Sequence, residues 1–252
     1  MRLNWKELKS RRENNIMQRV PTGIKGLDEL INGGLVPCSA VMVGGKAGTG
    51  KTLFCGQFLY TGALYREPGL YVTLEERVED IKQDIKETFD WDLDDLERRG
   101  LISWLPLRIR RVFHPIEKKE VLTMGFYQIT QNIVQAVESV GAKRVVIDPV
   151  SAVEMMFEDK YMIRAELGTL LDALKERGVT TLLVAEVPET EVGLSRSEFI
   201  EFAADAVIKL DFIYLAKEYQ RVITIKKMRR SKHSTFIHPF VIGPHGIEVL
   251  KV

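Results

Sequence analysis

The chain has 252 residues, enough for one large α/β domain with a buried core, and its hydrophobic share of 45% is ordinary for a globular protein. The formal net charge of +1 argues against a dedicated nucleic-acid binder, which carries a larger basic excess, although a local basic stripe is compatible with this total. No apolar run approaches the roughly 20 residues of a membrane-spanning helix, and the charged N-terminus lacks a signal-peptide core. We therefore expect a cytoplasmic protein with no membrane partner.

We divide the chain into an N-terminal arm, residues 1–18, and one domain, residues 19–252, because no repeat or low-complexity linker interrupts the latter. Within the arm, residues 3–14 predict a short amphipathic helix with only three apolar side chains. Such a helix is not stable alone in water. Two interpretations stay open: a loosely ordered terminus, or an arm that packs on a neighbouring subunit.

The two cysteines, Cys38 and Cys55, lie on either side of a glycine-rich segment. Neither belongs to a C-x-x-C pair, so their spacing does not indicate a zinc site. We interpret both as buried, reduced thiols of a cytosolic protein.

Apolar runs alternate with helical patterns from residue 38 onward. This alternation predicts an α/β fold, with a mainly parallel sheet flanked by helices on both faces. After about residue 204 the pattern changes to an antiparallel β meander. The predicted strands of the parallel part are 38–44, 69–74, 144–150 and 179–187; the predicted helices are one after the glycine loop through Leu59, then 77–89, 123–140 and 162–177; the meander turns near 216–218, 230–233 and 244–246.

Residues 45–52 read GKAGTGKT, the full G-x-x-x-x-G-K-[ST] pattern of a phosphate-binding loop. Its glycines let backbone N–H groups point at phosphate oxygens, and the helix that begins near Lys51 adds its positive end. Lys51 brings a charge to the β- and γ-phosphates, and the Thr52 hydroxyl is a ligand for Mg²⁺. A chance glycine-rich turn is the alternative, but the flanking strand and helix favour the phosphate site. The predicted nucleotide-binding residues are Gly45, Lys46, Ala47, Gly48, Thr49, Gly50, Lys51, Thr52 and Leu53, with the Lys46 side chain expected in solvent.

Acidic residues follow two predicted strands, at the edge where an open parallel sheet binds its ligands. Asp148 ends the run RVVID, and with the loop present we predict that it serves the Mg²⁺ site together with Thr52. An ordinary strand-ending Asp before a proline is the alternative. Glu75 and Glu76 lie just past the strand 69–74, where one of them can orient or deprotonate the attacking water. A helix start enriched in acids would explain one of this pair, and which one is the base stays open.

The segment RVPTGIKGLDELINGGLVPCSAVMVGGKAGTGKT (19–52) resembles the opening of KaiC-like ATPases of the RecA superfamily, in which a TGIxGLDEL…GGL lead-in precedes the phosphate loop. The resemblance covers nearly everything after residue 18 in one copy. The chain is most similar in this respect to single-domain KaiC-like proteins of archaea. It continues through YVTLEE (71–76), RVVIDPVSAV (144–153), TTLLVAEV (180–187), EFIEFAADAVIKL (198–210) and IKKMRRSKHSTFIHPFVIGPHGIEV (225–249).

This resemblance implies a RecA-like P-loop NTPase core that binds ATP or ADP with Mg²⁺ between the subunits of a homohexameric ring. It implies that Glu75 and Glu76 are the catalytic pair. The family's K-x-R pattern matches Lys227 and Arg229, which share one face of a strand and would reach a neighbouring subunit's γ-phosphate. His233 matches a family position near the bound nucleotide.

The chain departs from the family pattern in two places. Arg230 stands where the family often has a glycine after K-x-R, so we expect a different turn. Glu201 and Phe202 stand where autokinase members carry a Ser/Thr pair. Neither side chain can accept a phosphate, so we expect no autokinase activity at that position.

Two further segments have more than one interpretation. In PLRIRRVFHPIEKK (106–119), Arg108, Arg110 and Arg111 lie near Phe113 and His114, a composition that suits single-stranded DNA but also a solvated loop. Residues Met155, Met156 and Phe157 occupy the place of a DNA-contacting loop in RecA proteins, and we interpret them as core or interface side chains.

The leading hypothesis is a slow, Mg²⁺-dependent ATPase that works as a homo-oligomeric, hexameric ring. One alternative is a DNA-repair or recombination accessory protein whose binding of single-stranded DNA is controlled by ATP. Another is a regulatory scaffold whose nucleotide state sets its assembly or its protein partner.

Overall fold

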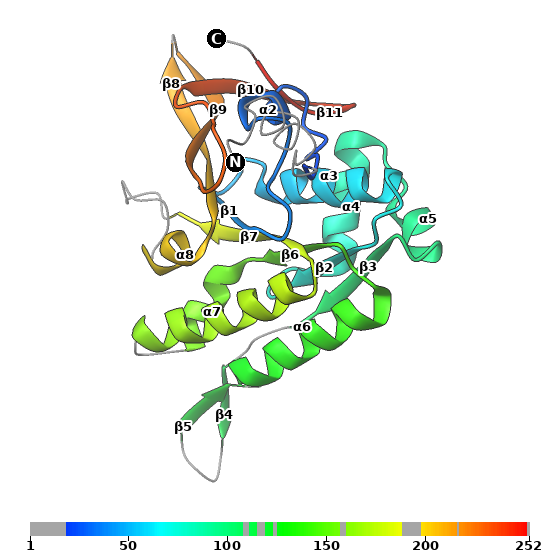
Figure 1. Cartoon of the computed structure of the whole chain (residues 1–252), viewed down its shortest axis with the longest axis vertical. Coiled ribbons are helices and arrows are strands. Elements are labelled where there is room, and N and C mark those ends of the chain that lie inside the picture. The colour runs from blue at the N-terminus through cyan, green and yellow to red at the C-terminus, as the bar shows by residue number, and fades with distance from the viewer. Residues whose placement is uncertain are drawn as a thin grey trace, which may run out of the picture.

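The computed structural model describes residues 19–107, 111–114, 119–122, 125–156, 160–187, 198–215 and 217–250, so the predicted arm lies outside the described part. Within that part, nine strands form one sheet in the spatial order β11-β10-β9-β8-β1-β7-β6-β2-β3 (Figure 1). The six strands from β8 to β3 run parallel, and β9, β10 and β11 continue the sheet in antiparallel fashion. Their bounds are β1 (Ala40–Gly45), β2 (Gly69–Thr73), β3 (Ile102–Pro106), β6 (Arg144–Asp148), β7 (Thr180–Glu186), β8 (Ala206–Leu215), β9 (Glu218–Met228), β10 (Ile237–Gly243) and β11 (Gly246–Val249).

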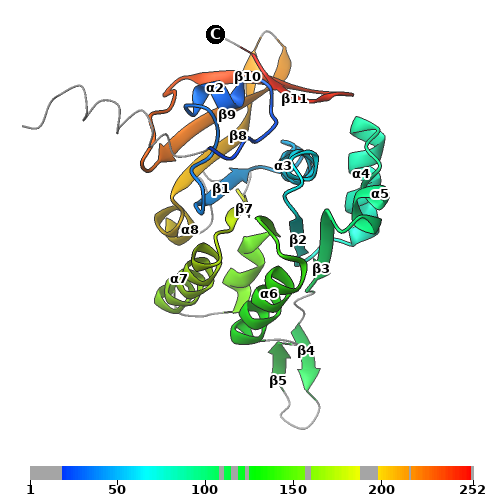
Figure 2. The same ribbon diagram turned by 45° about the vertical axis from the view of Figure 1, so that its right-hand side comes forward.

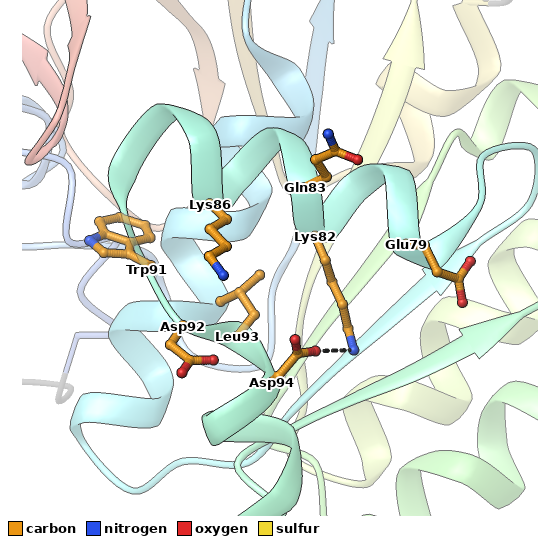
Figure 3. Close-up of a pocket in the computed structure, with 8 residues that line it drawn as sticks. All are labelled: Glu79, Lys82, Gln83, Lys86, Trp91, Asp92, Leu93 and Asp94. Atoms are coloured by element: carbon orange, nitrogen blue, oxygen red, sulfur yellow. Dashed lines mark hydrogen bonds and ion pairs between the residues drawn. The ribbon is translucent and has the colours of Figure 1, made fainter.

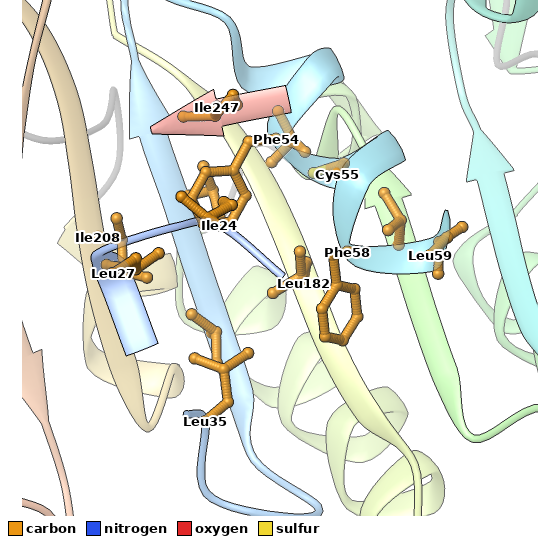
Figure 4. Close-up of a cluster of buried hydrophobic side chains, with 14 of the residues drawn as sticks. Ile24, Leu27, Leu35, Phe54, Cys55, Phe58, Leu59, Leu182, Ile208 and Ile247 are labelled. Atoms are coloured by element: carbon orange, nitrogen blue, oxygen red, sulfur yellow. The ribbon is translucent and has the colours of Figure 1, made fainter. Parts of the chain in front are cut away.

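The sheet has an apolar core on each face, which confirms the predicted α/β architecture. In β1, Val41 and Val43 face one core, while Ala40 and Met42 face the other, as the two-residue repeat of a strand requires. The lead-in, α3, α4 and α5 cover the first face, part of which Figure 4 shows; α6, α7 and α8 cover the second. The helices are α2 (Leu27–Leu30), α3 (Lys51–Leu64), α4 (Val78–Phe89), α5 (Leu93–Arg98), α6 (Phe126–Val140), α7 (Lys160–Glu176) and α8 (Glu198–Ala203), with a 3₁₀ helix η1 (Val150–Met156). No described helix is both long and apolar enough to cross a membrane.

Several elements were not predicted from the sequence. They include β3, α5 and an antiparallel hairpin of β4 (Arg111–His114) and β5 (Lys119–Leu122), which projects from the sheet below α6 (Figures 1 and 2). The hairpin occupies part of the segment in which we expected either a DNA contact or a solvated loop. Arg108 and Arg110 lie outside the described residues, as do Phe157 and the side chains of Met155 and Met156, so both questions stay open.

One buried cation joins the lead-in to the helix of the phosphate loop. The Arg144 side chain is 0% exposed, and its Nε donates to Glu67 Oε2 over 2.8 Å. Its Nη1 donates to the carbonyls of Pro21 (2.8 Å) and Phe58 (2.9 Å). Burial lowers the pKa of Arg144, although Glu67 acts in the opposite direction. Gly62 gives the guanidinium room, because a Cβ there would lie 2.5 Å from Arg144 Cδ.

We expect Arg144→Met to lower the free energy of unfolding by about 3–5 kcal/mol, because it strands two buried carbonyls and the Glu67 carboxylate. Chemical denaturation measures this loss. Arg98→Met is the control, since its exposed pair with Asp95 contributes only about 0–1 kcal/mol. Equal losses in both variants would contradict a structural role for Arg144.

Candidate active site

The phosphate loop connects the end of β1 to the start of α3 with a left-handed backbone. Gly48 has φ 73° and Gly50 has φ 99°, values that side chains with a Cβ rarely adopt. Gly45 is required for a different reason: a Cβ there would lie 2.6 Å from the Leu210 carbonyl and 2.8 Å from Thr49 Oγ1. The pattern's first and last glycines are therefore fixed by close packing and by backbone conformation respectively.

Lys51 folds back over the loop. Its Nζ donates to the Lys46 carbonyl over 2.9 Å, and Thr49 Oγ1 donates to the same carbonyl over 2.8 Å. Lys51 is only 8% exposed, and burial lowers its pKa while Glu186 and Asp148 oppose that change. The Lys51 ammonium thus lies inside the loop, near carboxylates. A bound phosphate oxygen can take the place of the Lys46 carbonyl as its hydrogen-bond acceptor. The Lys46 side chain, which we expected in solvent, is half-buried.

The loop opens into a cavity of about 330 Å³ at the carboxyl edge of the parallel strands. Most of the residues predicted for one nucleotide site meet there. The lining comprises Ala47, Gly48, Gly50, Lys51, Thr52, Leu53, Glu75, Glu76, Asp84, Asp148, Pro149, Glu186, Arg221 and Ile242.

Asp148 ends β6 beneath this cavity and accepts a 2.5 Å hydrogen bond from the buried Tyr71 hydroxyl. Burial, together with the nearby Glu76 and Glu186, raises the pKa of Asp148 to about 6, although the Tyr71 hydrogen bond and Lys51 act in the opposite direction. A carboxylate held in this state gains a favourable interaction when a cation reaches it.

The Glu75 and Glu76 side chains are exposed in the turn between β2 and α4. Burial and the neighbouring Glu186 raise the pKa of Glu75; burial and Asp84 raise the pKa of Glu76, which Lys51 lowers. The Thr73 hydroxyl donates to the Glu76 carbonyl over 2.7 Å and so fixes the turn. Both carboxylates stand at the cavity with raised proton affinity, as a base for water requires.

Two important cavity residues were missed in the sequence. Glu186 ends β7 directly beside Gly45, and its position at a strand end was an available signal. Arg221 lies in β9, and its Nη2 donates to the Gly48 carbonyl over 3.3 Å, while its guanidinium covers the Phe212 ring at 5.3 Å. No local motif marks Arg221, because only the meander's pairing brings it to the loop.

The three remaining predicted site residues lie elsewhere. Lys227 is paired with Val207 near the amino end of β8, which is the edge opposite the loop. Arg229 follows it, and the His233 Nδ1 bonds to the Ser234 carbonyl in the next loop. Arg230 adopts the left-handed conformation, with φ 60°, that a glycine favours, so whether this turn differs from the family's stays a prediction. The chain therefore does not bring these cations to its own phosphate loop.

A second cavity, of about 280 Å³, lies between α4 and α5 (Figure 3). Lys82 is its central cation, but it pairs with Asp94 over 2.8 Å and also with Glu97. Lys86 also lines this cavity, but the carboxylates of Glu79, Asp92 and Asp94 outnumber its two lysines, so the cavity does not suit a phosphate.

The residues at the loop fit a magnesium ion bound together with a nucleotide. The Thr52 hydroxyl and the Asp148 carboxylate line the same cavity and supply the oxygen ligands that Mg²⁺ prefers. The described residues contain no group of three or more His, Cys, Asp or Glu side chains that could hold a metal alone. This suits Mg²⁺, which commonly uses one or two protein ligands plus phosphates and water.

Comparison with known proteins decides the family. The protein-family profile described as "ATPase: KaiC" matches residues 20–252. The chain belongs to the KaiC family of ATPases. This confirms the resemblance seen in the sequence, and membership implies ATP binding and, in general terms, ATPase activity.

The chain spans less than half the length of some of the relatives it matches and nearly the full length of others. The chain is 34% identical to the circadian clock protein KaiC2 of Synechocystis, covering 93% of this chain but 40% of that protein. It is 33% identical to a UPF0273 protein of Thermotoga maritima, covering 93% and 96%. A crystal structure of a KaiC-like protein from Pyrococcus horikoshii superposes with a TM-score of 0.80 at 38% identity, covering 93% and 100%.

We expect Asp148→Asn to raise the Tm of the nucleotide-free protein near neutral pH. Because the folded pKa of about 6 exceeds the ordinary 3.8, the folded state binds the proton more tightly than the unfolded chain. The contribution of Asp148 to stability therefore falls as pH rises from about 4 to about 6 and is constant above that range. Thermal unfolding at about pH 8 and about pH 4.5 should show a gain for the variant that shrinks at the lower pH. A lower Tm of Asp148→Asn at the higher pH would contradict this account; Asp95→Asn is the exposed control.

Proposed function

We propose that this protein is a slow, Mg²⁺-dependent ATPase whose active sites lie between neighbouring copies of a homo-oligomeric ring. The observation that carries this proposal is the position of Lys227 and Arg229 at the sheet edge opposite the phosphate loop. The two cations lie close together: burial lowers the pKa of Lys227, and the positive charge of Arg229 lowers it further. Because of this position, Lys227 and Arg229 cannot contact a nucleotide bound at the phosphate loop of their own chain. We propose that they contact a nucleotide bound to a neighbouring copy.

The charge balance of the cavity supports the same proposal. Lys51 and Arg221 are opposed there by the carboxylates of Glu75, Glu76, Asp84, Asp148 and Glu186. ATP adds several negative charges, and more develop on the transferring phosphoryl group in the transition state. Cations from a neighbour would offset this charge, as an arginine finger does. We expect hydrolysis to be slow because the cavity remains acidic.

Each residue then has a defined chemical task. The loop N–H groups and Lys51 hold the β- and γ-phosphates in line for attack. Glu75 or Glu76 accepts a proton from water, whose oxygen forms the new bond to the γ-phosphorus while the bond to the ADP oxygen breaks. Thr52 and Asp148 would hold Mg²⁺, which neutralises charge on the phosphate oxygens. The products are ADP and inorganic phosphate.

Autokinase activity at the family position is not part of this proposal. Glu201 and Phe202 occupy that position, and neither has a hydroxyl that could receive a phosphoryl group. We therefore propose water as the sole acceptor at this site.

We expect Lys51→Ala to abolish ATP hydrolysis, since no other lysine lines the cavity among the described residues. Phosphate release at saturating ATP measures the loss. Lys86→Ala, an exposed lysine of α4, is the control and should retain wild-type turnover. Wild-type turnover in Lys51→Ala would refute the assignment of the phosphate loop.

We expect Arg229→Ala to lower kcat with little change in nucleotide affinity, because Arg229 lies far from the loop of its own chain. Mixing Arg229→Ala with Lys51→Ala then tests the shared site. Random assembly places an intact loop against an intact Arg229 at about one interface in four, so the mixture should recover about a quarter of wild-type turnover. A mixture no more active than its components would contradict a site built from two copies.

A further inference from the structure

The end of β9 is anchored to the end of α8 through Lys227. Its Nζ donates to the Glu201 carbonyl over 2.9 Å and to the Ala204 carbonyl over 2.7 Å. These carbonyls belong to the last turn of α8 and the residue just after it, where a helix attracts cations. An ammonium group has three donors, so one N–H of Lys227 stays available while the other two fix its direction.

Asp205 follows directly and contacts three separate elements. Its Oδ2 accepts from the Ala40 N–H over 3.0 Å and lies 2.9 Å from Lys175 Nζ. Its carbonyl accepts from the Arg229 N–H over 2.9 Å, and its Oδ1 lies 3.8 Å from Arg229 Nη1. Asp205 is only 7% exposed. Although burial opposes ionisation, the Ala40 N–H and the Lys175 ammonium hold its pKa below the usual value.

Asp205 contacts both the backbone and the side chain of Arg229, and the two contacts have different effects. The bond from its N–H to the Asp205 carbonyl fixes where the residue leaves β9. The Asp205 carboxylate attracts the guanidinium, whose side chain nevertheless remains 54% exposed. Arg229 is thus held at its base and oriented by charge, with most of its donors open to a partner.

We propose that Asp205 is a positioning residue that orients Arg229 toward the nucleotide of a neighbouring copy. This inference rests on the proposed function, because it assumes that Arg229 acts in trans. Asp205 touches no nucleotide and acts through Arg229. Lys175 balances its charge, so that the carboxylate does not bind Arg229 too tightly to release it to a phosphate.

A second route from Asp205 has to be separated from the first. Through the Ala40 N–H, Asp205 also holds the first residue of β1, the strand that leads to the phosphate loop of its own chain. Loss of the carboxylate could therefore impair either the cation that a subunit donates or the loop that it keeps. In the first case the variant subunit fails as the donor of Arg229; in the second it fails as the subunit that binds the nucleotide.

The experiment uses Asp205→Asn in the full chain, because the amide oxygen can still accept from Ala40 while the charge is lost. Alone, the variant should show a kcat lowered by about tenfold to a hundredfold, with KM little changed, as expected for a misdirected catalytic group. Mixed with Lys51→Ala, it should recover activity, since it provides the loop and its partner provides Arg229. Mixed with Arg229→Ala, it should not recover, because both partners then lack a directed Arg229.

Each other outcome overturns the inference. Recovery with Arg229→Ala but not with Lys51→Ala would show that Asp205 acts on its own loop. Recovery with neither, while Lys51→Ala and Arg229→Ala still complement each other, would show a structural role only. Unchanged kcat would exclude any role in turnover. Failure of Lys51→Ala and Arg229→Ala to complement each other would instead reject the shared site itself, and the inference with it.

The matched control is Glu138→Gln. Glu138, in α6, forms an ion pair over 2.7 Å with Arg177, which lies just after α7 and close in sequence to Lys175. Among the described residues, no hydrogen bond or ion pair joins the Glu138 side chain to β1 or β9. This variant removes an ion pair of comparable geometry and should leave kcat unchanged in every mixture. A loss equal to that of Asp205→Asn would show that any broken pair at this end of α7 suffices.

Discussion

The parallel pairing of β8 with β1 is the constraint on which the arrangement of this protein depends. Val41 lies opposite Ala206 and Gly45 opposite Leu210, so both strands run from the same edge of the sheet to the other. The loop after β1 therefore opens at the carboxyl edge. Since β9 returns antiparallel to β8, its last residues end at the amino edge. This strand arrangement thus separates the anion-binding loop from Lys227 and Arg229.

This separation changes the electrostatics of both edges. At the carboxyl edge, carboxylates outnumber cations, and Glu75, Glu76 and Asp148 all have raised pKa values. At the amino edge, burial and the nearby Arg229 lower the pKa of Lys227, while the Asp205 carboxylate acts in the opposite direction and the Glu201 and Ala204 carbonyls accept hydrogen bonds from its ammonium group. The charged groups that line the cavity at the carboxyl edge are mainly anionic, whereas Lys227 and Arg229 at the amino edge are cationic.

The sequence predicts what short motifs and strand ends encode. The phosphate loop, Asp148 and the glutamate pair were found because each follows an apolar run that reads as a strand. Glu186 follows one too, but a single glutamate there resembles any exposed strand end. Asp205 meets Ala40 across 165 positions of sequence, and no local pattern reports such a contact. Arg144 was missed for another reason, since a charged residue at the start of a strand is ordinarily taken as solvent-exposed.

The hairpin of β4 and β5 escaped prediction because its strands have four residues each, too few to establish a period. β3 is also short and ends in a proline, which weakens any strand signal. Both elements are edge or isolated structures, where burial imposes little pattern on the sequence. The central strands, buried on both faces, were the easiest to recognise for the opposite reason.

Arg230 has a consequence for how rigidly the end of β9 is held. A residue with a side chain in the left-handed region costs about 1–2 kcal/mol, which a glycine would avoid. Glycine, however, also has more conformations available in the native turn and in the unfolded chain. An arginine at this position restricts the backbone conformations of the turn. The local strain is therefore accompanied by a more rigid backbone at Arg229, the residue before it.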